Sequence, residues 1–276
     1  MPEEPTDLPS ETPGLTPELT PAIPSAALPP RAIWGGRDLL WLALFIPAGL
    51  LCAALMVSAG YLMARPIAGW HSRVHALQGN AIFLLVQQSI FYALILAFLS
   101  ILVRVRHQQP LWRSLGGRIP SFRQVVEYLA GGGILAVLVS VLLRLRPDAH
   151  AFPLERLFDS RFASYAIGAF AISLAPVVEE VIFRGVLFAV IEGAAGPIVA
   201  VLTTATLFAG LHAPEYWQAW NHLGMILLVG IAFSLARAIT GSLTPSILLH
   251  CGFNAFIMLG LFLSTDRFHG VTSLGQ

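Results

Sequence analysis

Seven long apolar segments occupy most of the sequence beyond its first 33 residues. Each is close to the roughly 20 consecutive apolar residues with which a helix crosses the hydrocarbon core of a bilayer. The segments run approximately over residues 38–64, 80–104, 125–145, 163–191, 196–212, 221–240 and 243–264. They predict an all-α fold, a polytopic membrane helix bundle of about seven transmembrane helices.

The composition agrees with an integral membrane protein. Hydrophobic residues make up 56% of the chain and charged residues 11%, whereas soluble domains contain about 25% charged residues. The formal net charge of +1 gives no indication of a nucleic-acid partner. All 16 basic residues are arginine, which hints at a GC-rich bacterial genome and therefore at a bacterial inner membrane. Cys52 and Cys251 both lie in apolar runs, so neither a structural disulfide nor a zinc-finger-type site is expected.

The first 33 residues differ from the rest because they are rich in proline and acidic side chains. Proline at this density supports no helix, and the stretch has too little apolar surface to build a core. We expect a disordered, partly polyproline II tail that is a passive extension rather than a docking motif. It lacks the basic start and adjoining apolar run of a signal peptide, so the first apolar segment should be retained.

Local features of the segments refine this prediction. The run Gly131-Gly132-Gly133 should let a neighbouring helix approach the third segment closely. The fourth segment is long, and Pro176 inside it frees a backbone carbonyl one turn earlier, so it should be tilted or broken. The fifth segment is short and ends at His212. Arginines between the second and third segments predict a cytoplasmic loop and a cytoplasmic N-terminus.

Three polar clusters interrupt the later apolar segments. An ionisable side chain at the bilayer centre costs roughly 2.5–3.5 kcal/mol on insertion scales, so such groups are rare without a function. We therefore expect the clusters to form one buried polar site assembled from three membrane helices. Their members are Glu179, Glu180, Arg184, His212, His250 and Asn254.

The first cluster separates two carboxylates by their positions on a helix. Glu180 and Arg184 are four residues apart, so they share a helical face and should form an ion pair. Glu179 points to a different face and has no local cation. A carboxylate without a partner in a low-dielectric site has a raised pKa, which suits a general base. A buried Glu–Arg pair with Glu179 facing a polar cavity is the purely structural alternative.

The other two clusters are each ambiguous alone. His212 stands at a segment end, where a single histidine is more often interfacial than catalytic, although Ala209 and Gly210 leave room beside it. His250 and Asn254 are four residues apart on one face. Both can donate hydrogen bonds to a developing oxyanion, or simply join two helices.

Together the clusters contain what peptide hydrolysis requires. Glu179 is a candidate base for water, His212 a second polarising group, and His250 and Asn254 candidate donors to the carbonyl oxygen. No serine stands in an obvious nucleophile motif, and neither cysteine has a paired base at motif spacing. An activated water is therefore the simplest nucleophile.

The ordered motifs Glu-Glu-x-x-x-Arg, Phe-x-x-x-His and His-x-x-x-Asn resemble the CPBP family, the CAAX protease and bacteriocin-processing intramembrane endopeptidases. The resemblance covers roughly residues 160–264. It implies that Glu179 and His212 activate the water, that Glu180 and Arg184 shape the site, and that His250 and Asn254 form the oxyanion hole. It divides the chain into N-terminal transmembrane helices (34–155), a catalytic core (156–264) and a short tail (265–276). Family members commonly have eight membrane helices, one more than the seven segments found here.

The residues leave the cofactor open. Glu179, His212 and His250 could bind zinc, because two imidazoles and a carboxylate leave one position for water. A glutamate mechanism without metal is equally compatible with the motifs. The expected partners are the lipid bilayer and a membrane-associated peptide or protein substrate, which the family name alone does not require to be prenylated.

Two other functions compete with hydrolysis. A transporter could use the same groups as a proton or cation relay, but the first three segments show no polar counterpart to the clusters. A non-catalytic assembly or immunity partner is the second alternative, and the complete motif set disfavours it.

Overall fold

The computed structural model describes residues 33–69, 71–77, 79–145 and 160–268. Within these ranges the regular structure is entirely helical, which confirms the predicted all-α fold. The predicted proline-rich tail lies outside the described residues except for Ile33, and the final tail is described only to Phe268.

Five described helices are long and apolar enough to cross a membrane. They coincide with the first, second, third, sixth and seventh predicted segments. They are α1 (Gly36–Ala68), α2 (Ala81–His107), α4 (Phe122–Leu145), α9 (Trp220–Thr240) and α10 (Leu243–Ser264). The fifth segment forms the shorter α8 (Pro197–His212), which ends at the predicted histidine. Two short helices, η1 (Val74–Leu77) and α3 (Leu111–Ser114), lie in the connections on either side of α2.

The fourth segment is broken, as predicted. It consists of α5 (Arg161–Ile172), α6 (Leu174–Glu180), the π-helix η3 (Val181–Leu187) and α7 (Phe188–Ala195). The first break falls at Ser173, directly after Ile172. Pro176 has no N–H to donate to the carbonyl of Ile172, so the helix is weakest at this point. The break redirects the chain just before the Glu179-Glu180 pair.

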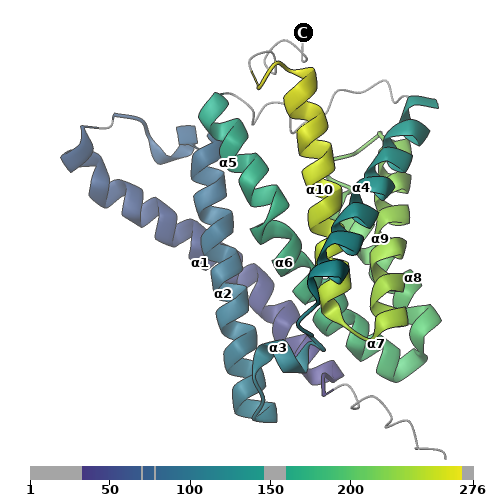
Figure 1. Ribbon diagram of the computed structural model, residues 1–276. Helices are drawn as coiled ribbons and strands as arrows, with labels where there is room; N and C mark the ends of the chain where they lie inside the picture. Colours follow the sequence, from purple (N-terminus) through teal and green to yellow (C-terminus); the bar gives the residue numbers. More distant parts are fainter. Residues whose placement is uncertain (1–32, 70, 78, 146–159, 269–276) are drawn as a thin grey trace, which may run out of the picture. The chain divides into compact units, whose positions relative to one another are not determined.

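Helix α10 packs chiefly against α4, while α8 packs against α9 and α1 against α2 (Figure 1). Two glycines set the close approach of α4 and α10. A Cβ atom added to Gly132 would lie only 2.1 Å from the carbonyl oxygen of Leu249, and one added to Gly252 only 2.2 Å from that of Leu129. The predicted role of the Gly131–133 run in close helix packing is therefore confirmed for its middle residue.

We expect Gly132→Ala to destabilise the protein, because the added methyl group would overlap the α10 backbone, which cannot move without repacking both helices. Overpacking of a core typically costs 1–3 kcal/mol, and clashes with backbone lie at or above the upper end of that range. Thermal unfolding in detergent measures the effect. Gly133→Ala is the matched control, since its Cβ would meet the ring of Phe256 at an ordinary 3.7 Å. Equal melting temperatures for the two variants would contradict the packing argument.

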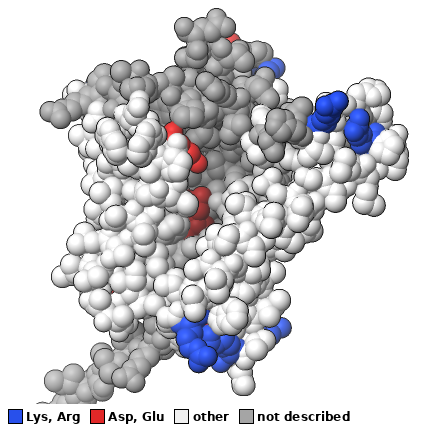
Figure 2. All heavy atoms as spheres, turned by 180° about the vertical axis from the view of Figure 1, so that it is seen from behind, with Lys and Arg blue, Asp and Glu red and all other residues white. Residues whose placement is uncertain are grey.

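The surface of the bundle matches a membrane environment. Large apolar side chains are exposed along the outer helices, including Leu44, Leu51, Ile101, Leu138 and Leu263. Figure 2 shows that the arginines of one face gather towards its ends, whereas acidic side chains lie in a hollow between them. A chain with this pattern is an integral membrane protein with a polar recess in an otherwise apolar surface.

Candidate active site

The three predicted clusters meet around His250 on α10. Its Nδ1 lies 2.9 Å from Oε1 of Glu180, and its Nε2 lies 3.8 Å from Oε2 of Glu179. The imidazole therefore bridges the two carboxylates at the end of α6. His250 is 5% exposed, so this arrangement is nearly closed to solvent.

Glu180 and Arg184 form the predicted ion pair. Arg184 Nη1 lies 2.9 Å from Glu180 Oε1, and both side chains are fully buried. The remaining donors of the guanidinium bind α9, through Ser234 Oγ at 3.1 Å and the carbonyl oxygen of Gly230 at 2.8 Å. The ring of Phe208 lies under the guanidinium, 4.6 Å from its central carbon. This pair therefore joins the broken segment to α8 and α9.

The backbone around Arg184 differs from the ideal α-helix on which the pairing was predicted. Residues Val181–Leu187 form a π-helix, in which hydrogen bonds close wider turns. The N–H of Phe188 accordingly binds the carbonyl of Phe183, five residues earlier. The predicted pair still forms because Glu180 is the last residue before the wider turns and Arg184 reaches back across the first of them.

Glu179 has a different environment from Glu180. Its side chain is 19% exposed, and its Oε1 accepts a hydrogen bond of 3.2 Å from the hydroxyl of Tyr92 on α2. Its Oε2 faces His250. The two neighbouring carboxylates thus have distinct surroundings, one closed and paired with arginine, the other accessible.

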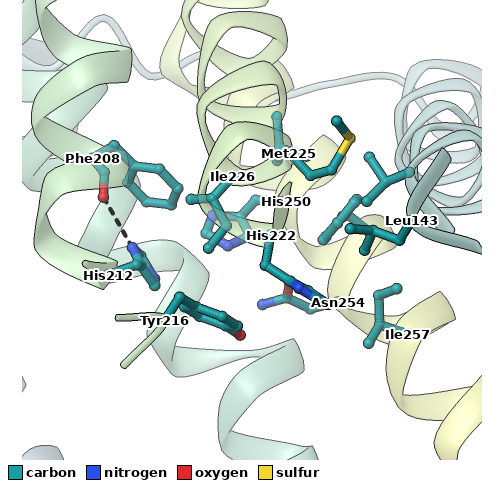
Figure 3. Close-up of a pocket in the computed structure, with 13 residues that line it drawn as sticks. Leu143, Phe208, His212, Tyr216, His222, Met225, Ile226, His250, Asn254 and Ile257 are labelled. Carbon is teal, nitrogen blue, oxygen red and sulfur yellow. Dashed lines mark hydrogen bonds between the residues drawn. The ribbon is translucent and has the colours of Figure 1, made fainter. Parts of the chain in front are cut away.

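A pocket of about 230 Å³ opens beside these groups. Figure 3 shows His212, His250 and Asn254 among its lining residues, together with Tyr216 and His222. The remaining lining residues are apolar: Val139, Leu143, Phe208, Met225, Ile226, Val229, Phe253 and Ile257. Imidazole and amide groups therefore face a cavity whose other walls are hydrophobic.

The hydrogen bonds of His212 and Asn254 define which of their atoms remain for chemistry. His212 Nδ1 lies 2.9 Å from the carbonyl oxygen of Phe208 and must donate to it, because a carbonyl oxygen only accepts. This bond leaves Nε2 of His212 for chemistry. Asn254 Nδ2 donates to the carbonyl oxygen of Ala171 at 2.8 Å, beside the break at Ser173. Because an amide nitrogen carries two hydrogens, Asn254 keeps a second one.

The connection between α8 and α9 adds two titratable groups near the site. The pKa of Glu215 is raised above its ordinary value, chiefly by burial. The charge of His212 opposes this shift, and the charge of Glu179 adds to it. Burial and the neighbouring Glu215 raise the pKa of Tyr216 to about 12. Glu215 is exposed, and its carboxylate interacts electrostatically with both His212 and Glu179.

The three candidate zinc ligands lie near one another but are not arranged as a metal site. Among the described residues, no group of three or more His, Cys, Asp or Glu side chains is arranged to hold a metal ion. Glu179 and His250 are neighbours, but Nδ1 of His250 is engaged by Glu180, and His212 does not complete a three-ligand set with them. The residues as they lie do not fit the open three-ligand zinc site considered from the sequence.

Tyr92, Ser234 and Glu215 contribute to the site although no sequence motif indicated them. The available signal for Tyr92 was the polar pair Gln87-Gln88 one turn before it, inside an otherwise apolar segment. Ser234 and Glu215 carried no comparable signal, because their contacts depend on how α9 and the α8–α9 connection pack.

Comparison with known proteins agrees with the motifs. Residues 161–256 match the family model of the type II CAAX prenyl endopeptidases, described as Rce1-like. No curated protein and no solved structure matches the chain. The matched range contains Glu179, Glu180, Arg184, His212, His250 and Asn254. This part of the chain is thus similar to the type II CAAX prenyl endopeptidases.

Proposed function

We propose that this chain is an intramembrane endopeptidase that cleaves membrane-associated peptides with a water molecule activated by Glu179 and His212. It would act in the inner membrane of a bacterium, in keeping with its all-arginine basic residues. The observation that supports the proposal best is that Glu179 lies beside His250, which lines one pocket together with His212 and Asn254.

Glu179 is the proposed general base. It is the more accessible of the two carboxylates, so water can reach it, and among the described residues no arginine forms an ion pair with it. The base removes a proton from water while the water oxygen bonds to the carbonyl carbon of the substrate. The carbon–nitrogen bond then breaks, and the proton moves to the departing amine. Nε2 of His212 is the group that orients the water on the pocket side.

His250 and Asn254 are the proposed donors to the carbonyl oxygen as it becomes negative. The second hydrogen of Asn254 Nδ2 is left for this purpose by its bond to Ala171. His250 donates from Nδ1 to Glu180, so its Nε2 serves as a donor when both ring nitrogens carry a proton. Such donors are most effective in a site that excludes water, and the apolar walls of the pocket provide these surroundings. Glu180 and Arg184 would act indirectly, by fixing the position of His250 and of the broken segment.

The test is hydrolysis of a peptide library by the purified protein in detergent, with and without a strong zinc chelator, read by mass spectrometry. We expect cleavage under both conditions, because the described residues bring no third ligand to Glu179 and His250. Loss of cleavage with the chelator and its return with zinc would contradict the metal-free mechanism. Absence of cleavage from every peptide, combined with proton flux in liposomes, would favour a relay instead.

A further inference from the structure

Tyr92 contacts the proposed base from outside the family-matched range. It lies on α2, 87 positions before Glu179, and its hydroxyl lies 3.2 Å from Glu179 Oε1. Tyr92 is 7% exposed, so its hydroxyl is shielded from bulk water. A buried tyrosine hydroxyl normally finds a hydrogen-bond partner, and here that partner is the carboxylate proposed to perform the chemistry.

The ring of Tyr92 is held in place independently of Glu179. It stacks on Phe170 of α5, with ring centroids 5.6 Å apart and planes inclined by 18°. On its own helix it also contacts Phe91, at 6.0 Å between centroids. These contacts leave the hydroxyl little freedom to turn away from Glu179.

The hydrogen bond distinguishes the two oxygen atoms of the base. Tyr92 binds Oε1, whereas Oε2 lies 3.8 Å from Nε2 of His250. A carboxylate that rotated freely would present either oxygen, or neither, to the water. A fixed donor on Oε1 leaves Oε2 directed towards His250, which is where the substrate carbonyl would lie.

We propose that Tyr92 is a positioning residue of the hydrolytic site, which anchors Glu179 through Oε1 so that Oε2 takes the proton from water. The proposal rests on the proposed role of Glu179 as the base. It assigns a function to α2, a helix that lies outside the range matched by the family model.

The decisive variant is Tyr92→Phe, which keeps the stacked ring and removes only the hydroxyl. We expect kcat to fall by roughly 10-fold to 100-fold with KM nearly unchanged, the usual loss when a hydrogen bond to a charged group is removed. The size-exclusion profile in detergent should match that of the wild type. Tyr165→Phe is the matched control, because the ring of Tyr165 packs against Phe262 and Phe268 in a cluster away from Glu179.

A double-mutant comparison separates positioning from general packing. In the Glu179→Gln background, where the base is already absent, Tyr92→Phe should change the residual rate less than about twofold, because residues that act as a unit are non-additive. Equal fold-losses in both backgrounds would overturn the proposal and show that the hydroxyl only supports the structure. Wild-type kcat for Tyr92→Phe would overturn it directly while leaving the role of Glu179 intact. Full activity of Glu179→Gln would overturn both.

Discussion

Glu179→Gln is expected to lower peptide hydrolysis by roughly 10²–10⁴-fold, the usual contribution of general base catalysis. The amide keeps the size and shape of the carboxylate but cannot take a proton from water. Its oxygen can still accept the hydrogen bond from Tyr92, so the local structure should persist. Initial rates on a peptide identified by library cleavage measure the effect, and detergent size-exclusion profiles verify the fold.

The matched control for this change is Glu127→Gln. Glu127 lies on α4 with its side chain 52% exposed and forms an ion pair with Arg123. The same loss of one carboxylate there should leave the rate unchanged. If Glu179→Gln cleaves at the wild-type rate, Glu179 is not the base, and the accessible Glu215 becomes the next carboxylate to replace.

Features that depend on local sequence were predictable. Runs of apolar residues of the right length predicted each of the five long helices, because in a membrane the backbone satisfies its hydrogen bonds within the segment itself. Pro176 indicated the break in the fourth segment, because its effect on Ile172 acts within one turn. Gly132 indicated the close contact with another helix, although it gave no indication that the neighbour would be α10.

Features that depend on packing between distant segments were not predictable from one sequence. The bond from Tyr92 to Glu179 spans 87 positions, and nothing local to either residue requires it. The zinc interpretation counted suitable ligands but had no information on their separation, and within the described part of the chain they are not arranged as a three-ligand set. The π-helix at Val181–Leu187 was also missed, since the difference between i→i+4 and i→i+5 bonding there has no clear composition signal.

The second large effect is expected for the buried ion pair. Arg184→Ala should destabilise the protein by about 3–5 kcal/mol, because it leaves Glu180 as a fully buried carboxylate with His250 as its remaining neighbour. It also removes the bonds to Ser234 and Gly230 that hold α9. Glu180→Ala should have a similar effect, since it leaves the guanidinium without its counter-charge. Thermal unfolding of the purified protein in detergent, or the expression level in cells, would record both losses.

Two comparisons test whether burial, rather than the charge pair itself, causes this loss. Arg123→Ala breaks another Arg–Glu pair four residues apart, but at an exposed position on α4, where solvent screens the charges. It should therefore leave the melting temperature almost unchanged.

Glu179→Ala removes a neighbouring carboxylate that is partly exposed and has no arginine partner among the described residues, so it should reduce activity strongly and stability little. Equal stability of Glu179→Ala, Glu180→Ala and Arg184→Ala would contradict the division of roles between the two glutamates. Unequal stability, with the Glu180 and Arg184 variants the weaker ones, would show that one carboxylate supports the fold while its neighbour remains free for chemistry.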